Sequence, residues 1–342
     1  MPDNKSMVSP FAFIAVISVA MLSTVCPFSQ ARAAEPDALE KLPINQLQFI
    51  GTHNSYHIRE PGASNRVREW NYSHAPLEVQ LDRGVRSFEL DLHSKAGEFE
   101  VFHVPLLDEG TTCRKLADAL QRVRTWSEAH PRHVPISFLF ELKKEGPKLD
   151  RNVKRIDSAA LDHLDEVLRA AFPPARLITP DNVRGDASTL RDAITSRGWP
   201  TLEQARGRVL FILHDDAEQR ELYTAGRPSL EGRAMFVRSD PSRPDAAALI
   251  LDNPRDSQIS PLCRSGYFIR TRADSDLGAN FDRNVARRDA AFASGAHILS
   301  TDFPSGEAQA DTGYSVEFPS SAPARVNPVN GPESLRGKQV SE

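Results

Sequence analysis

The chain has 342 residues and a formal net charge of −4 at pH 7; 26% of its residues are charged and 40% are hydrophobic. This composition is typical of a folded globular protein, and the near-neutral charge argues against a nucleic-acid-binding protein, which is usually strongly basic. The length could hold two average domains, but α/β barrels often use roughly 200 to 250 residues or more as one domain.

The first 33 residues differ in composition from the rest of the chain. An apolar run, FAFIAVISVAMLSTVCPF, is followed by small and polar residues with an A-x-A pattern at Ala31-Arg32-Ala33. This order predicts a secretory signal peptide over residues 1–33, so we expect an exported protein, either periplasmic or secreted. The weakly basic start leaves an uncleaved anchor as the alternative. No later segment is apolar over the roughly 18 residues that a membrane helix needs.

Removal of the signal peptide would take Cys26 with it and leave Cys113 and Cys263. In an oxidising exported setting these two cysteines could form one disulfide. They could equally stay unpaired, because the sequence does not give the distance between their Cα atoms. Both alternatives stay open.

From about residue 44, short β-type runs alternate with longer amphipathic ones. The runs typical of strands cover residues 47–53, 85–93, 98–104, 134–143, 208–216, 234–240, 267–274 and 297–304. The runs typical of helices include residues 113–130, 158–172 and 281–296; in the first of these, apolar residues fall at helical spacing at Leu116, Leu120, Val123 and Trp126. Eight strands that alternate mostly with helices favour an α/β fold, a (β/α)8 TIM barrel in a single domain over residues 34–320.

Two regions depart from a regular barrel. Residues 56–84 are mostly loop, and the connection from Asp91 to Phe99 is as short as a hairpin, so we expect distortion near the second and third strands. Residues 321–342 are rich in proline, serine and charge, which predicts a disordered tail.

Polar side chains stand at the ends of four successive predicted strands, where barrels carry their functional groups. They are His53 and Asn54 in FIGTHNSYH, Glu89 and Asp91 in SFELDLH, His103, and Glu141. Singly, each could be a solvated side chain, but their combination at one mouth favours a site. Two carboxylates that share a strand face repel each other unless a cation lies between them, so a bound divalent ion is the simplest explanation.

The order of these motifs resembles the phosphatidylinositol-specific phospholipase C superfamily of barrel phosphodiesterases. The phrases QFIGTHNSYH, LDRGVRSFELDLH, PRHVPISFLFELK, GWPTLEQARGRVLFIL, IRTRAD and STDFP are similar to its calcium-dependent bacterial branch. The resemblance runs from about Asn45 to Pro319, nearly the whole mature chain.

The resemblance implies two catalytic histidines, His53 and His103, and a metal site at Asn54, Glu89, Asp91 and Glu141. Carboxylate and amide oxygens are hard ligands, which suit Ca²⁺ first and Mg²⁺ second. We expect Lys143, Arg272 and Asp274 to face the same mouth, and they are weaker candidates for contacts with the substrate head group.

The resemblance also implies the reaction. It is cleavage of a phosphatidylinositol-type phosphodiester by attack of the inositol 2-hydroxyl on phosphorus. We expect His103 to be the general acid or to stabilise the phosphate, and His53 to be its acid–base partner; a metal-bound carboxylate is the alternative base. We expect a phospholipid or another phosphodiester as substrate, transient contact with a membrane surface, no nucleic-acid partner, and a monomer. The lipid and head-group preference, and which histidine is the acid, stay open. The alternatives are a glycerophosphodiester phosphodiesterase and a secreted barrel that binds without turnover.

Overall fold

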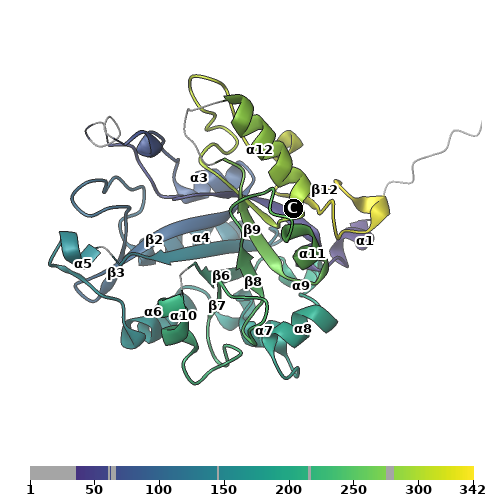
Figure 1. Cartoon of the computed structure of the whole chain (residues 1–342), viewed down its shortest axis with the longest axis horizontal. Coiled ribbons are helices and arrows are strands. Elements are labelled where there is room, and N and C mark those ends of the chain that lie inside the picture. Colours follow the sequence, from purple (N-terminus) through teal and green to yellow (C-terminus); the bar gives the residue numbers. More distant parts are fainter. Residues whose placement is uncertain (1–35, 61, 63–66, 145, 215–216, 275–280) are drawn as a thin grey trace, which may run out of the picture. The chain divides into compact units, whose positions relative to one another are not determined.

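The computed structural model describes residues 36–342, except residues 61, 63–66, 145, 215–216 and 275–280 (Figure 1). The predicted signal peptide lies outside the described residues. The described residues all belong to one compact unit. Within the described part of the chain, no helix combines the length and the apolar character needed to cross a membrane.

Eight parallel strands form a nearly closed barrel in the order β7-β6-β4-β2-β1-β10-β9-β8, so the predicted TIM barrel is confirmed (Figure 1). The strands are β1 (Leu47–Thr52), β2 (Val85–Lys95), β4 (Ile136–Leu142), β6 (Val209–Leu213), β7 (Met235–Val237), β8 (Ala248–Ile250), β9 (Phe268–Arg272) and β10 (Ile298–Thr301). A single parallel bridge between Arg238 and Ala248 connects the two ends of this order.

The third predicted strand is not part of the barrel. Within residues 98–104, β3 (Glu98–Val101) pairs antiparallel with the end of β2, and the two-residue strand β5 (Val153–Lys154) pairs with the same end. The chain reverses between β2 and β3 at Ala96 and Gly97, which have φ of 54° and 82°, as a tight hairpin turn requires. The barrel strand missing from the prediction is β8, which is only three residues long. The distortion expected near the second and third strands is this hairpin.

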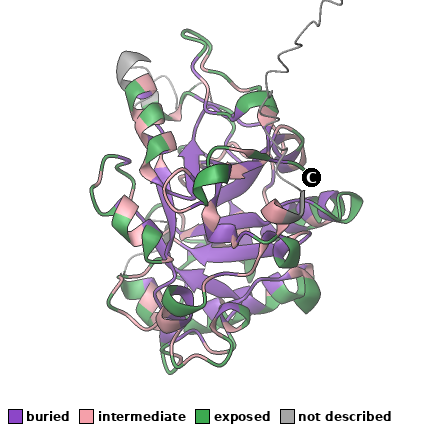
Figure 2. Cartoon of the chain, turned by 90° about the vertical axis from the view of Figure 1, so that its right-hand side faces the viewer, coloured by how far each residue is buried: buried purple, intermediate pink, exposed green. Residues whose placement is uncertain are grey.

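Helices surround the strands (Figure 1). They are α1 (Pro36–Glu40), α3 (Leu77–Asp82), α4 (Leu116–Ala129), α5 (Gly146–Leu149), α6 (Ser158–Ala171), α7 (Pro180–Arg184), α8 (Leu190–Ser196), α9 (Leu202–Ala205), α10 (Ala217–Thr224), α11 (Ile259–Arg264) and α12 (Phe281–Ser294). Short 3-10 turns lie at Ile44–Gln46, Arg68–Trp70, Pro174–Arg176, Pro319–Ser321 and Glu333–Leu335. The apolar face predicted for α4 is buried, and Figure 2 shows buried residues concentrated in the strands.

The prediction of a disordered C-terminal tail was wrong. Strand β11 (Ala324–Val326) pairs antiparallel with the start of β1, and β12 (Gln339–Val340) pairs with β11. The backbone N–H of Asn327 also donates to the carbonyl of Gln46 at 2.8 Å. Composition misled here because the segment's few apolar residues, such as Val326, are buried and its backbone polar groups bond to the barrel.

The structure also answers the question about the cysteines, since Cys113 and Cys263 are both buried and unpaired. The sulfur of Cys263 lies 3.9 Å from Nε2 of His297, while Cys113 lies beside the Thr112 hydroxyl just before α4. Burial raises the pKa of Cys113 to about 11 and that of Cys263 to about 12. Both side chains are therefore thiols rather than thiolates at neutral pH.

A buried histidine before β10 predicts a loss of stability at acid pH. Nδ1 of His297 accepts a hydrogen bond from the backbone N–H of Ile269 at 2.9 Å, and Nε2 donates to the Asn45 carbonyl at 2.7 Å, so the ring is neutral. Burial lowers the pKa of His297 from 6.5 to about 4. The contribution of the neutral His297 ring to the stability of the folded protein is fully present above pH 6.5. It is lost as the pH falls toward 4, because over this range His297 is protonated in the unfolded chain but not in the folded protein.

Over that window the free energy of unfolding is expected to fall by up to about 3 kcal/mol through His297 alone. His297→Gln can make both hydrogen bonds with an amide that does not titrate. We therefore expect its melting temperature to fall less steeply between pH 7 and 4.5 than that of the wild type. Equal slopes in the two proteins would contradict this role for His297.

Candidate active site

The candidate residues gather at the carboxyl ends of the barrel strands, around the turn after β1. A side chain at Gly51 would not fit, because its Cβ would lie 2.8 Å from Cβ of Ser87 and 2.9 Å from Cγ2 of Ile298. Asn54 has a φ of 43°, a left-handed conformation that asparagine adopts more readily than most residues. Its neighbour His53 is placed by a hydrogen bond from its backbone N–H to the carbonyl of Thr301 at 3.0 Å.

His53 is held by a carboxylate from the far end of the chain. Its Nδ1 lies 2.8 Å from Oδ1 of Asp302, and Oδ2 of Asp302 accepts from Arg272 at 2.9 Å. Because a carboxylate only accepts, Nδ1 carries the hydrogen and Nε2 is left free for proton exchange. Nε2 lies 3.9 Å from Oε1 of Glu89. Burial and the charge of Arg272 lower the pKa of His53 well below its usual value, so the ring is neutral at neutral pH.

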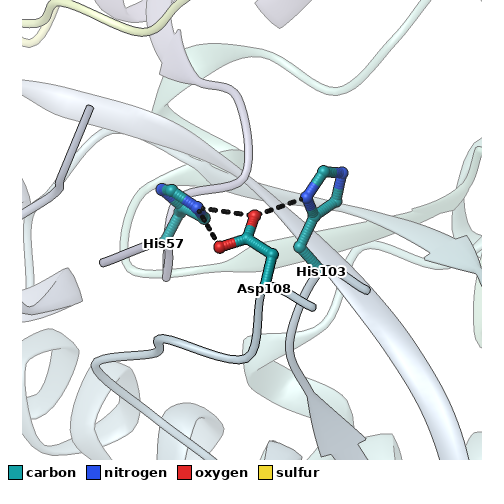
Figure 3. Close-up of side chains that lie close together, drawn as sticks. All are labelled: His57, His103 and Asp108. Carbon is teal, nitrogen blue, oxygen red and sulfur yellow. Dashed lines mark hydrogen bonds and ion pairs between the residues drawn. The ribbon is translucent and has the colours of Figure 1, made fainter. Parts of the chain in front are cut away.

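His103 reaches the mouth from the loop after the β2–β3 hairpin, not from the end of a barrel strand as the sequence predicts. Its Nδ1 lies 2.8 Å from Oδ2 of Asp108, and Nε2 of His57 lies 3.0 Å from the same oxygen (Figure 3). The rings of Trp70 and His103 pack in a T-shaped arrangement, with their centroids 5.3 Å apart. Both candidate histidines therefore have Nδ1 on a carboxylate and are partly exposed.

The three acidic candidates lie on neighbouring strands. Asp91 of β2 is the direct partner of Glu141 of β4 in the parallel register. Glu89, Glu141 and His214, which follows β6, present ligand atoms that all lie within 4.8 Å of one another. This group has a donor set that could hold a metal ion, and the structure brings the predicted carboxylates together.

Two further observations test whether a cation fits. The side-chain oxygen of Asn54 is buried without a hydrogen-bond partner, and so is Oδ1 of Asp91. A buried polar atom without a partner is costly, so such atoms are usually satisfied by a group that the protein binds. These oxygens, together with Glu89 and Glu141, make up a set of hard donors that suits Ca²⁺.

Two cationic side chains already contact these carboxylates. Nζ of Lys143 lies 2.8 Å from Oδ2 of Asp91 and 2.9 Å from Oε1 of Glu141. Nη2 of Arg270 lies 2.5 Å from Oε2 of Glu89. Lys143 is thus placed among the acidic side chains, where a bound cation would compete with it for Asp91 and Glu141.

Burial and neighbouring charges shift the pKa values of the two carboxyl groups of β2, Glu89 and Asp91, in opposite directions. Burial alone would raise the pKa of Glu89, but the charge of the Arg270 guanidinium outweighs burial and lowers the pKa to about 2. Burial raises the pKa of Asp91 to about 6, against the charge of Lys143 and with the help of Glu141. Glu89 is therefore ionised throughout the neutral range, while Asp91 gains most from an added cation.

The weaker substrate candidates differ in exposure. Arg272 is partly exposed at the mouth and is held by Asp302 and Asp274. Asp274 is buried, and the hydroxyl of Thr301 donates to it, so it lies behind Arg272 rather than at the surface of the mouth. Burial and the neighbouring Asp302 raise the pKa of Asp274 to about 6.

Four residues of this site were not singled out from the sequence: Asp108, His214, Arg270 and Asp302. Two of them lie at strand ends, where they could have been noticed: His214 follows β6 and Asp302 follows β10. Arg270 lies in the middle of β9. Asp108 lies in the loop after β3, where only the fold shows that it meets His103.

The structure combines a parallel barrel with two carboxylate-held histidines and an acidic cluster at one mouth, an arrangement suited to acid–base chemistry beside a divalent cation. The sequence matches the family described as "Phosphoinositide phospholipase C, Ca2+-dependent" over residues 42–99 and 94–328. The chain belongs to this family and is a phospholipase C-type phosphodiesterase.

Solved structures of phospholipases have the same fold. A calcium-dependent phosphoinositol-specific phospholipase C from a Pseudomonas species is 19% identical, with 81% of this chain and 96% of that chain covered at a TM-score of 0.55. A Ca²⁺-dependent phosphatidylinositol-specific phospholipase C from Streptomyces antibioticus is also 19% identical, with coverage of 76% and 94% and a TM-score of 0.55. The enzyme from Listeria monocytogenes is 15% identical, with coverage of 78% and 91% and a TM-score of 0.50. No curated protein sequence matched.

Proposed function

We propose that this enzyme cleaves the phosphodiester of phosphatidylinositol-type lipids by attack of the inositol 2-hydroxyl on phosphorus. The observation that carries the proposal is the pair of histidines, His53 and His103, each with Nδ1 on a carboxylate and each partly exposed at one mouth. Such a pair can take up one proton and deliver another without a protein nucleophile.

The lowered pKa of His53 favours it as the base, because a neutral ring has a lone pair on Nε2. Nε2 of His53 takes the proton of the 2-hydroxyl while the new O–P bond forms. Nε2 of His103, when protonated, donates to the glycerol oxygen as the P–O bond breaks. The products are a cyclic inositol phosphate and diacylglycerol. Arg272, partly exposed and paired with the same Asp302 that holds His53, would bind the phosphate.

Asn54, Glu89, Asp91 and Glu141 would hold Ca²⁺, with Mg²⁺ as the second choice. Bound there, the ion would lower the pKa of the attacking hydroxyl and neutralise charge on the phosphoryl oxygens. Lys143, which lies among these carboxylates, would then be free to turn toward the substrate head group.

The test is incubation with phosphatidylinositol, with and without calcium, and phosphorus NMR of the water-soluble product. A cyclic inositol phosphate supports the proposal. Glycerol 3-phosphate from a glycerophosphodiester would instead assign the enzyme to the alternative phosphodiesterase class. Absence of any turnover by a folded, calcium-loaded protein would favour a barrel that only binds.

We also propose that the protein is exported, with residues 1–33 as its signal peptide, and that it works at a lipid surface. The largest exposed apolar side chains among the described residues include Leu106 and Leu107, 72% and 53% exposed, on the loop that follows β3. Ile58, 39% exposed, belongs to a segment that bonds to the same loop through the Gly110 carbonyl. Exposed apolar side chains beside a mouth that takes lipid are suited to enter the outer part of a bilayer.

Replacing Leu106 and Leu107 together with serine is expected to weaken binding to phosphatidylcholine vesicles by about tenfold or more. Full burial of one leucine contributes roughly 1.5 to 3 kcal/mol, and the double variant loses two leucines that would each be partly buried in the bilayer. Sedimentation with vesicles measures the affinity, and turnover of a water-soluble inositol phosphodiester is the control that should change little. Unchanged vesicle affinity would show that another surface contacts the lipid.

A further inference from the structure

One buried carboxylate sets the state of the His103 ring. Oδ2 of Asp108 lies 2.8 Å from Nδ1 of His103 (Figure 3). Asp108 has no exposed surface. Because an ionised carboxylate only accepts hydrogen bonds, Nδ1 of His103 carries the hydrogen, and Nε2 points away from Asp108. That orientation leaves Nε2 as the atom that can exchange a proton with a substrate.

A second histidine, the buried His57, holds the Asp108 carboxylate in place. Nε2 of His57 lies 3.1 Å and 3.0 Å from the two oxygens of Asp108 (Figure 3). Nδ1 of His57 lies 3.0 Å from the carbonyl oxygen of Tyr72. Burial would raise the pKa of Asp108, but the hydrogen bonds from His103 and His57 lower it below its usual value, so the carboxylate is ionised. Asp108 could not turn away from His103 without breaking its contacts with His57.

The backbone of this loop is equally constrained. Val104 and Asp108 exchange two backbone hydrogen bonds, each 2.9 Å long, which close the turn that carries the carboxylate. The rings of Trp70 and His103 also pack in a T-shaped arrangement, with their centroids 5.3 Å apart, and this contact restricts rotation of the imidazole. The ring of His103 is thus held both by a hydrogen bond at Nδ1 and by packing.

We propose that Asp108 is a positioning residue, which holds His103 in the tautomer and orientation that present Nε2 to the substrate, and that His57 holds Asp108 in place. The proposal rests on the catalytic role proposed above for His103. It assigns no contact with the substrate to Asp108 or His57, which act through the ring of His103.

A double-mutant cycle tests this relation. Asp108→Ala is expected to lower kcat by about 10²-fold with little change in KM, because the loss falls on proton transfer and not on binding. In a His103→Ala background the same substitution should cost nothing further, since its only route of action is gone. Asp118→Ala, on the exposed surface of α4, is the matched control and should leave kcat unchanged.

Losses that multiply in the double variant would overturn the proposal, because Asp108 would then act independently of His103. Full activity of His103→Ala is a different result, which would overturn the catalytic assignment itself. Nitrogen-15 NMR of labelled wild-type protein needs neither a variant nor a substrate: it should find His103 protonated at Nδ1. A neutral His103 protonated at Nε2 would overturn the proposal even if Asp108→Ala does not fold.

Discussion

Replacing His53 or His103 with alanine is expected to lower kcat by at least about 10²-fold, the low end for a general acid or base. Each substitution removes one of the two Nε2 atoms that the structure leaves free at the mouth, so one of the two proton transfers loses its carrier. Both histidines are partly exposed, so neither loss opens a large cavity, and the melting temperature should change little. Turnover of phosphatidylinositol in mixed micelles, followed by phosphorus NMR, gives kcat.

The chain offers a control of the same chemistry. His163 lies on α6 with half of its side chain exposed, and its only described ion pair is with Glu166 on the same helix. His163→Ala removes an imidazole without changing any residue of the candidate active site, so the kcat of this variant should equal that of the wild type. A folded His53→Ala or His103→Ala protein with near-normal kcat would contradict the assignment of that histidine.

The barrel could be predicted from the sequence because most of its strands are long enough to show a pattern. The runs that became β2 and β4 are long and end in charged residues, so both the strand and its carboxyl end are visible. Strand β8 was missed although β7, which is equally short, lies within a predicted run, so length alone does not explain the miss. The run at 98–104 was misplaced because a hairpin strand and a barrel strand have the same alternation.

The predicted site residues are those whose position follows from strand alternation. Glu89, Asp91 and Glu141 point to one mouth because side chains on neighbouring parallel strands keep the same register. Their partners could not be predicted in this way. Asp302 meets His53 across 249 residues and Arg270 meets Glu89 across 181, and only the closed barrel brings such pairs together.

Because of the acidic cluster, we expect calcium to have a large effect on both the melting temperature and the turnover of the enzyme. If the proposed site is correct, Ca²⁺ binds only the folded barrel, because Asn54, Glu89 and Glu141 come from three different strand ends. A ligand that binds only the folded state at a hundred times its dissociation constant adds about 2.7 kcal/mol to the free energy of unfolding. For a domain of this size we expect a rise of roughly 5 °C in the melting temperature. Excess EGTA should abolish turnover, and added calcium should restore it.

Asp91→Asn is the informative variant, because it removes one charge at almost constant size from the carboxylate whose pKa burial raises to about 6. The variant should need more calcium for the same thermal shift, while Asp118→Asn on the exposed face of α4 should shift like the wild type. In the Asn variant, Lys143 retains Glu141 as its only described carboxylate partner, so the apo protein should not be destabilised by an unpaired cation.

A protein that does not respond to calcium would also have a physical explanation, because Lys143 and Arg270 already contact the carboxylates. If Lys143 and Arg270 neutralise the carboxylates permanently, the protein will show full activity in EGTA and no thermal shift with calcium. Lys143→Met then separates the two cases. With a calcium site, removal of the competing ammonium should tighten calcium binding, as followed by the same thermal shift. Without one, it leaves Asp91 and Glu141 facing each other uncompensated, and the melting temperature should fall whether or not calcium is present.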